Sequence, residues 1–151
     1  MKLLKLLPLL FLFFAAACST LVLQPADFNY PVESVISIRD DGFAMDERYS
    51  LTFNTRPLFF EETGDSLAYV GKEIRMIRNA QGYYFITSKN FKNVYVFSID
   101  ESAMNMKSKI LISETGIQNP AFNQRNQYIE LMDESTKIKL TSEGIESEDQ
   151  K

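Results

Sequence analysis

The sequence contains no histidine and no tryptophan, and it has a single cysteine, Cys18. Without histidine the chain cannot form a Ser-His-Asp triad, a Cys-His dyad or the usual zinc sites. One cysteine allows no internal disulfide, so packing alone must hold the fold together. These absences remove the commonest enzyme classes, and we therefore predict a non-enzymatic protein without a cofactor or a metal.

Positive charge is also scarce. The chain has 16 basic and 20 acidic side chains, which gives a formal net charge of -4. Binding to nucleic acid requires clustered lysine and arginine, whereas the basic residues here are scattered among acidic ones. We therefore expect no nucleic-acid partner.

The chain begins with MKLLKLLPLLFLFFAAAC, which has the order of an export signal. Lys2 and Lys5 form a basic start, Leu6 to Phe14 form an apolar core, and three alanines lead directly into Cys18. This order resembles the bacterial lipoprotein signal, in which a cysteine after small residues is lipidated and becomes the new N-terminus.

The resemblance implies cleavage between Ala17 and Cys18, with the lipid, including palmitate, on the Cys18 thiol. It also implies that Ser19, a non-acidic residue after the cysteine, directs the protein to the outer membrane, facing the periplasm. Two other interpretations stay open. In the first, the uncharged run from Leu6 to Leu23, which is long enough to do so, spans a bilayer uncleaved. In the second, Cys18 is a buried, unmodified cysteine of the core.

The resemblance divides the chain into four parts. We expect a signal peptide at residues 1–17, a lipidated N-terminus and tether at 18–29, one antiparallel β domain at 30–141 and an acidic, disordered tail at 142–151. The tether reaches at most about 35 Å when extended, so the domain stays near the membrane.

From Tyr30 onward, short β-rich runs separated by turn residues recur about every ten residues, and no helical periodicity is present. This pattern predicts an all-β fold, either a single antiparallel β-sandwich or a partly closed β-barrel of about eight to nine short strands. The predicted strands are Val32 to Ile38, Arg48 to Asn54, Leu58 to Glu61, Glu73 to Arg78, Tyr83 to Thr87, Val94 to Ile99, Met104 to Ile112, Tyr128 to Met132 and Lys137 to Leu140.

One hairpin and one further strand have a clear sequence pattern. The firmest hairpin joins Glu73 to Arg78 with Tyr83 to Thr87 through the turn at Asn79 to Gly82. In the strand at 104–112, alternation predicts one apolar face, formed by Met104, Met106, Ile110 and Ile112.

The strands at 83–87 and 94–99 carry apolar or aromatic residues on both faces. One hypothesis is a central hairpin covered by other strands or by a loop at Phe59 to Tyr69. The other is an exposed aromatic surface that binds a partner, since aromatic residues dominate many protein interfaces. The candidate contact residues are Tyr83, Tyr84, Tyr95 and Phe97.

A second candidate site lies in the segment Asn119 to Gln127, which we expect to be a loop. Its amides, its arginine and its aromatic ring suit sugar binding, and the candidate ligand residues are Phe122, Asn123, Gln124 and Arg125. Three adjacent carboxylate pairs are candidates for hydrolysis: Asp40 and Asp41, Glu61 and Glu62, and Asp133 and Glu134.

Three functions follow from these features. The first is a membrane-anchored envelope lipoprotein that binds another envelope protein through the aromatic surface. The second is a β-barrel lipoprotein that binds a small lipid or saccharide. The third is a carboxylate-based hydrolase.

Overall fold

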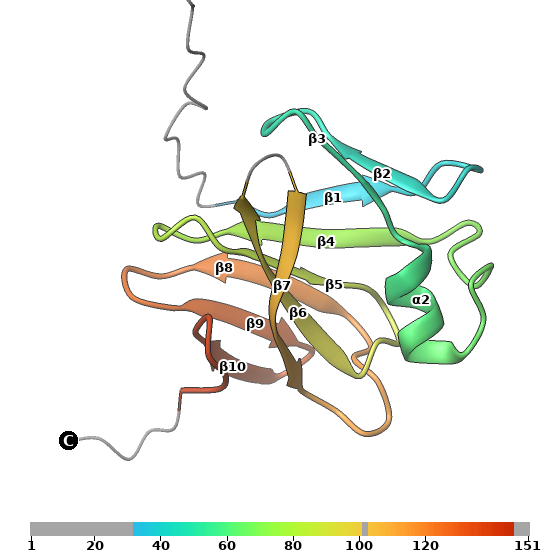
Figure 1. The fold of residues 1–151 in the computed structure, drawn as a ribbon. Coiled ribbons are helices and arrows are strands. Elements are labelled where there is room, and N and C mark those ends of the chain that lie inside the picture. The colour runs from blue at the N-terminus through green and yellow to red at the C-terminus, as the bar shows by residue number, and fades with distance from the viewer. Residues whose placement is uncertain (1–31, 101–102, 147–151) are drawn as a thin grey trace, which may run out of the picture.

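The computed structural model describes residues 32–100 and 103–146 (Figure 1). Ala17 and Cys18 lie outside these residues. The described part contains ten strands and the helix α2 (Arg56–Thr63). The strands are β1 (Ser34–Ser37), β2 (Phe43–Asp46), β3 (Leu51–Asn54), β4 (Glu73–Arg78), β5 (Tyr84–Thr87), β6 (Asn93–Asp100), β7 (Ala103–Leu111), β8 (Pro120–Gln124), β9 (Ile129–Asp133) and β10 (Thr136–Leu140).

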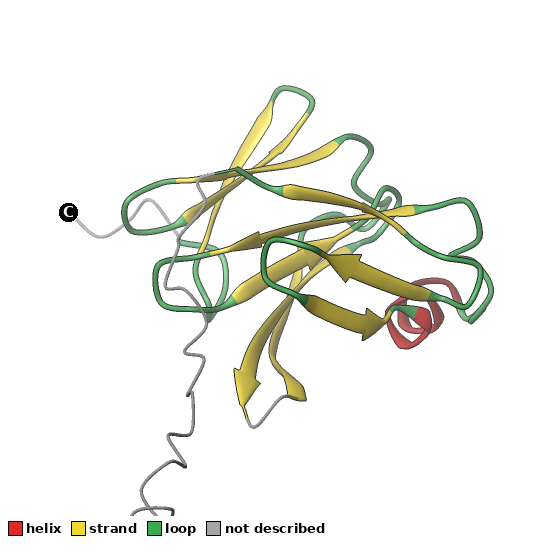
Figure 2. Ribbon diagram, turned by 90° about the horizontal axis from the view of Figure 1, so that it is seen from above, coloured by secondary structure: helices red, strands yellow, loops and turns green. Residues whose placement is uncertain are grey.

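The strands form three antiparallel sheets. A five-stranded central sheet has the order β1-β4-β5-β6-β7, a second sheet has the order β10-β9-β8, and β2 and β3 form a hairpin. Figures 1 and 2 show β8, β9 and β10 side by side, the β2–β3 hairpin next to β1, and α2 at one end of the molecule. The predicted all-β sandwich is confirmed. A barrel is not formed, because the described sheets do not close.

Two apolar clusters fill the spaces between the layers. The first cluster joins one face of the central sheet to α2 and the β2–β3 hairpin, and it includes Ile36, Ala44, Phe59, Ile74 and Tyr95. The second cluster joins the opposite face to β8, β9 and β10. It includes Phe85, Val96, Phe122, Ile129 and Leu131.

The hairpin of β5 and β6 lies between the two clusters. Tyr84 and Tyr95 belong to the first cluster, whereas Phe85 and Val96 belong to the second. Other strands cover both faces of this hairpin. The segment that begins at Phe59 also covers it, since the Phe59 ring packs against the Phe91 ring beside the hairpin at a centroid distance of 4.8 Å. The double-sided apolar pattern of these strands therefore reflects burial on both faces.

The N-terminal end of β1 is fastened to both sheets by Glu33. Its Oε1 accepts a hydrogen bond from Arg75 Nη1 of β4 at 2.5 Å, and its Oε2 accepts one from the backbone N–H of Phe122 in β8 at 2.8 Å. The carboxylate is mostly shielded, since 13% of the side chain is exposed. Glu33 therefore holds the start of the domain in place.

Two predicted elements differ from the structure, and one strand of the structure was not predicted. The segment Leu58 to Glu61, predicted as a strand, lies in α2, which has Pro57 in its first turn and ends at Gly64 in the left-handed conformation (φ 76°). The expected loop at Asn119 to Gln127 contains β8, and β2 was not predicted. These segments are ordered by tertiary packing, which local propensity does not describe.

The alternation predicted for β7 is also wrong. Met104 packs against the first cluster, whereas Ile110 belongs to the second. The register between β6 and β7 shifts at Val96 and Phe97. A bulge moves all later side chains to the opposite face, which explains the change.

The described end of the chain continues past the domain boundary expected at 141. Ile145 forms an isolated β-bridge with Leu140, and the N–H of Glu146 donates to the carbonyl of Lys139 at 2.9 Å. Residues 142–146 therefore fold back along β10. The remainder of the expected tail lies outside the described residues.

Candidate functional site

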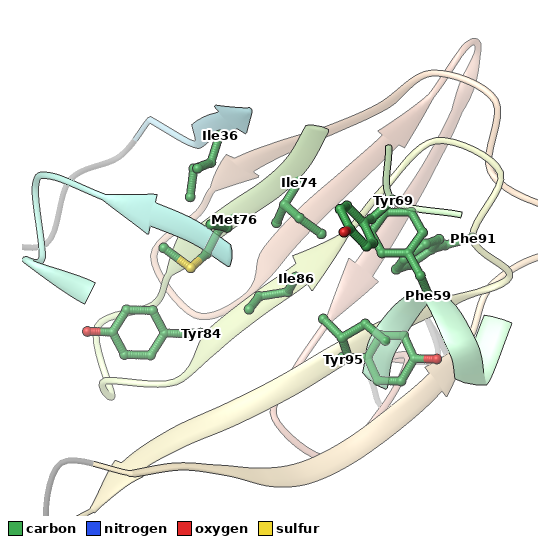
Figure 3. Close-up of a cluster of buried hydrophobic side chains, with 11 residues drawn as sticks. Ile36, Phe59, Tyr69, Ile74, Met76, Tyr84, Ile86, Phe91 and Tyr95 are labelled. Carbon is green, nitrogen blue, oxygen red and sulfur yellow. The ribbon is translucent and has the colours of Figure 1, made fainter. Parts of the chain in front are cut away.

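The four aromatic residues expected to form a partner surface are not an exposed patch. Tyr84 and Tyr95 are buried, with exposed fractions of 5% and 0%, and Phe97 and Tyr83 are half-buried. Figure 3 shows Tyr84 and Tyr95 among the side chains of the first cluster. The prediction of an exposed aromatic surface is therefore wrong, because both faces of this hairpin are covered.

The Tyr95 hydroxyl is paired inside this packing. It donates to Glu62 Oε1 at 2.8 Å, and the same carboxylate accepts hydrogen bonds from Asn93 Nδ2 (2.8 Å) and the Lys92 N–H (2.7 Å). Burial, followed by the bond to Glu62, raises the pKa of Tyr95 above its ordinary range. Glu62 fastens α2 to β6.

The other carboxylate pairs also have structural partners. Glu61 accepts a hydrogen bond from Lys109 Nζ at 2.6 Å. Asp41 Oδ1 accepts one from the Phe43 N–H at 3.1 Å, and Asp133 Oδ1 accepts one from the Asn119 N–H at 2.7 Å. These contacts close turns or join elements within the described part of the chain.

The residues expected to bind a ligand in a loop lie in and after β8. Phe122 is buried in the second cluster, so it cannot stack on a sugar in this conformation. Asn123 and Gln124 are half-buried on the same strand, and Asn123 forms a bridge with Val32. Arg125 Nη2 donates to Glu130 Oε2 at 2.8 Å. The predicted four-residue ligand group is therefore not assembled.

The described part of the chain offers two other negative findings. Residues 32–100 and 103–146 contain no group of three residues placed to hold a metal ion. No helix among them is long and apolar enough to cross a membrane.

Among the described residues, β1 is an edge strand of the central sheet with no strand laddered to its outer side. The Ile38 N–H donates to the carbonyl of Lys72 at 3.2 Å. In this register, the even-numbered residues of the segment form the backbone hydrogen bonds with β4. Because these classes alternate along an antiparallel pair, Val35 and Ser37 direct their N–H and C=O groups away from β4. The free edge of β1 is therefore formed by these two residues.

The same reasoning applies to β2. The Thr55 N–H donates to the carbonyl of Gly42 at 2.9 Å, so the even-numbered residues of β2 pair with β3. Met45 therefore directs its backbone groups away from β3 and toward β1. The edges of β1 and β2 face one another, yet no ladder joins them in the described structure.

A groove of about 340 Å³ separates these two edges. It is lined by Ser34, Val35, Ile36, Ser37, Met45, Asp46, Glu47 and Arg48. Val35 and Met45 are large apolar residues that are half exposed, at 50% and 49%. The groove thus combines unpaired strand edges with apolar side chains, the two features that recognise an extended peptide.

Hydrogen bonds limit the groove at both ends. At one end, Arg48 Nη1 donates to the carbonyls of Val32 (2.8 Å) and Glu33 (3.3 Å). At the other end, the Arg39 N–H donates to the carbonyl of Phe43 at 3.0 Å. Between these ends β1 and β2 diverge, because β1 joins the central sheet while β2 covers its first cluster.

Asp46 is a buried carboxylate in the wall of this groove. It is 2% exposed, and its Oδ1 accepts hydrogen bonds from the backbone N–H groups of Arg48 (2.8 Å) and Tyr49 (3.1 Å). Its Oδ2 has no hydrogen-bond partner among the described residues. Burial raises the pKa of Tyr84, and the charge of Asp46 raises it further while Arg78 opposes the shift.

The groove was not predicted from the sequence. A sequence signal for it exists, since the four residues of β1, Ser-Val-Ile-Ser, contain no charge and no proline that would discourage pairing at an edge. The pattern does not predict the groove by itself, because it has this meaning only for a strand at the edge of a sheet. Comparison of the chain with protein-family models, curated proteins and solved structures finds no match.

Proposed function

We propose that this chain is a bacterial envelope lipoprotein, anchored by lipid on Cys18, that binds another envelope protein without catalysing a reaction. The partner contributes an extended strand, which occupies the groove between β1 and β2. The observation that carries the proposal is that the edges of β1 and β2 face one another at Val35, Ser37 and Met45. No β-ladder joins these edges in the described structure.

The physical basis is the completion of two ladders by one strand. A backbone hydrogen bond contributes a net of about 0.5–1.5 kcal/mol, and a strand between β1 and β2 gains such bonds on both sides. The half-exposed side chains of Val35 and Met45 would be covered at the same time. A handful of bonds and two apolar contacts suit a reversible interaction.

The anchor places this groove close to the membrane. The described chain begins at Val32, directly before β1, and the proposed tether from Cys18 is short. Ser19 after the lipidated cysteine favours the outer membrane, facing the periplasm. A partner strand in the same compartment would therefore meet the groove within a few nanometres of the bilayer.

The anchor and the interaction can be tested in the same cells. Radioactive palmitate should label the wild-type chain, and Cys18→Ser should abolish both the label and membrane fractionation. A photoreactive amino acid at position 35 should cross-link a partner protein, while the same group at position 111, on the opposite edge of the central sheet, should not. An unlabelled wild type contradicts the anchor, and equal cross-linking at both positions contradicts the site.

A small-ligand function has less support. One of its two expected sites, a barrel interior, is absent from the described fold, where two packed clusters occupy the spaces between the layers. The other expected site was the segment Asn119 to Gln127. The predicted ligand residue Phe122 is one of the packed side chains.

A further inference from the structure

We infer that the strand received by this groove carries a lysine or arginine, and that Asp46 selects it. The inference rests on the proposed function and names the chemistry of the partner. It starts from the Oδ2 atom of Asp46, which is buried and lacks a hydrogen-bond partner in the described part of the chain.

A buried carboxylate oxygen without a partner is costly. The other oxygen of Asp46 already accepts two backbone N–H bonds, so that half of the group is satisfied. An unmade hydrogen bond to a buried charged group costs more than one to a neutral group. A cationic donor from a bound strand would remove this cost, and a charge-assisted bond is about twice as strong as a neutral one.

The charge of the groove points to the same donor. Its lining contains two carboxylates, Asp46 and Glu47, against one guanidinium, Arg48. Arg48 Nη1 is directed to the carbonyls of Val32 and Glu33 at the end of the groove. A strand with a cation between apolar residues complements this wall better than a neutral or acidic strand.

The alternative is that Asp46 serves the fold alone, through the charge of Arg78. The Arg78 guanidinium lies 5.8 Å from the ring centroids of Tyr49 and Tyr84, and both Arg78 and Asp46 influence Tyr84 electrostatically. If this were the whole role of Asp46, its charge would matter for stability and would not affect the choice of peptide.

The test uses the purified full chain and three fluorescent heptapeptides of alternating threonine and valine. Their central residue is lysine, norleucine or glutamate. We expect the wild type to bind the lysine peptide at least about tenfold more tightly than the norleucine peptide, and to bind the glutamate peptide most weakly. Asp46→Asn keeps the Oδ1 acceptor and removes the charge.

In Asp46→Asn, the lysine preference should disappear while binding of the norleucine peptide stays within about twofold of wild type. Glu47→Gln, which removes the neighbouring exposed carboxylate, is the matched control and should keep most of the preference. Equal binding of lysine and norleucine peptides by wild type overturns the inference and leaves strand addition standing.

Two further outcomes also decide the matter. If Asp46→Asn lowers the melting temperature yet retains the lysine preference, the carboxylate acts within the fold and the inference is wrong. If no peptide binds, the inference fails, and cross-linking at position 35 in cells then decides separately whether the proposed function fails with it.

Discussion

The two edges of the central sheet, β1 and β7, differ in the features that discourage pairing with another strand. The β7 edge is nine residues long, carries Lys107 and Lys109, and contains the register shift opposite Val96 and Phe97. The β1 edge is four residues long and uncharged. Charged residues and bulges discourage edge-to-edge pairing, so β7 has protection that β1 lacks.

The difference indicates which edge is available for binding. Lys109 pairs with Glu61 on the β7 side, whereas Val35 and Ser37 of β1 line the groove. An unprotected strand edge is a hazard for aggregation unless another strand or segment covers it. The comparison therefore favours β1 as the edge to which the proposed partner strand would add.

The largest expected effect comes from placing a proline at each edge. Val35→Pro removes an N–H that points into the groove and leaves pairing with β4 intact, so partner capture should fall at least about thirtyfold, which corresponds to about 2 kcal/mol. Leu111→Pro is matched, because Leu111 is equally exposed (49%) and the Ile112 N–H bond to Lys92 shows that Leu111 faces outward. Quantitative co-purification measures the capture of the partner. Loss of capture in both variants would show that the β1 and β7 edges do not differ in partner binding.

A smaller effect is expected from the acids that support each edge. Glu33→Gln weakens the shielded contacts to Arg75 and Phe122, and the free energy of unfolding should fall by about 1–3 kcal/mol. Glu61→Gln removes an exposed ion pair with Lys109 and should cost under about 0.5 kcal/mol. Urea unfolding of both variants measures the difference, and equal costs would show that the β1 end is no better fixed than the β7 side.

Removing the protection of β7 should have a weaker consequence. In Lys107→Thr with Lys109→Thr, the edge keeps its bulge and loses its charges, so self-association measured by sedimentation should strengthen several-fold. The same experiment on wild type gives the baseline. An unchanged sedimentation profile would mean that the bulge alone protects β7.

The smallest effect concerns the turn that closes one end of the groove. The hydrogen bond from the Phe43 N–H, together with the charge of Arg39, lowers the pKa of Asp41. A lowered folded-state pKa stabilises the fold at pH values above the unfolded-state pKa and stops doing so as the pH falls through the folded value. The carboxyl carbon resonance of Asp41 should therefore titrate below pH 3.8, and a midpoint at or above that value contradicts this description.

The sequence predicted the fold class because strand periodicity and turn residues are local signals. The hairpin of β4 and β5 follows the prediction closely, with Asn79 Oδ1 accepting the Gln81 and Tyr83 N–H bonds and Gly82 at φ 89° in the turn. The helix α2 was missed because it buries only Leu58 and Phe59, which is too short a stripe to give a helical period.

The candidate site could not be predicted in the same way. Whether Val35 is free depends on β1 pairing with β4, which lies over thirty residues further along the chain, instead of forming a ladder with the adjacent β2. The aromatic residues were misjudged for a related reason. An apolar residue on each face of a strand predicts either burial or an exposed surface, and only the positions of α2, β2 and β8 decide between them.

Amide hydrogen exchange tests the central claim most directly. In the purified full chain, the amides of Val35, Ser37 and Met45 should exchange rapidly, whereas that of Ile36, paired with β4, should be protected. Adding the lysine heptapeptide should slow the first three and leave Leu111 on the opposite edge unchanged. Protection of Val35 and Ser37 before any peptide is added, or slowing at Leu111 instead, would contradict the account.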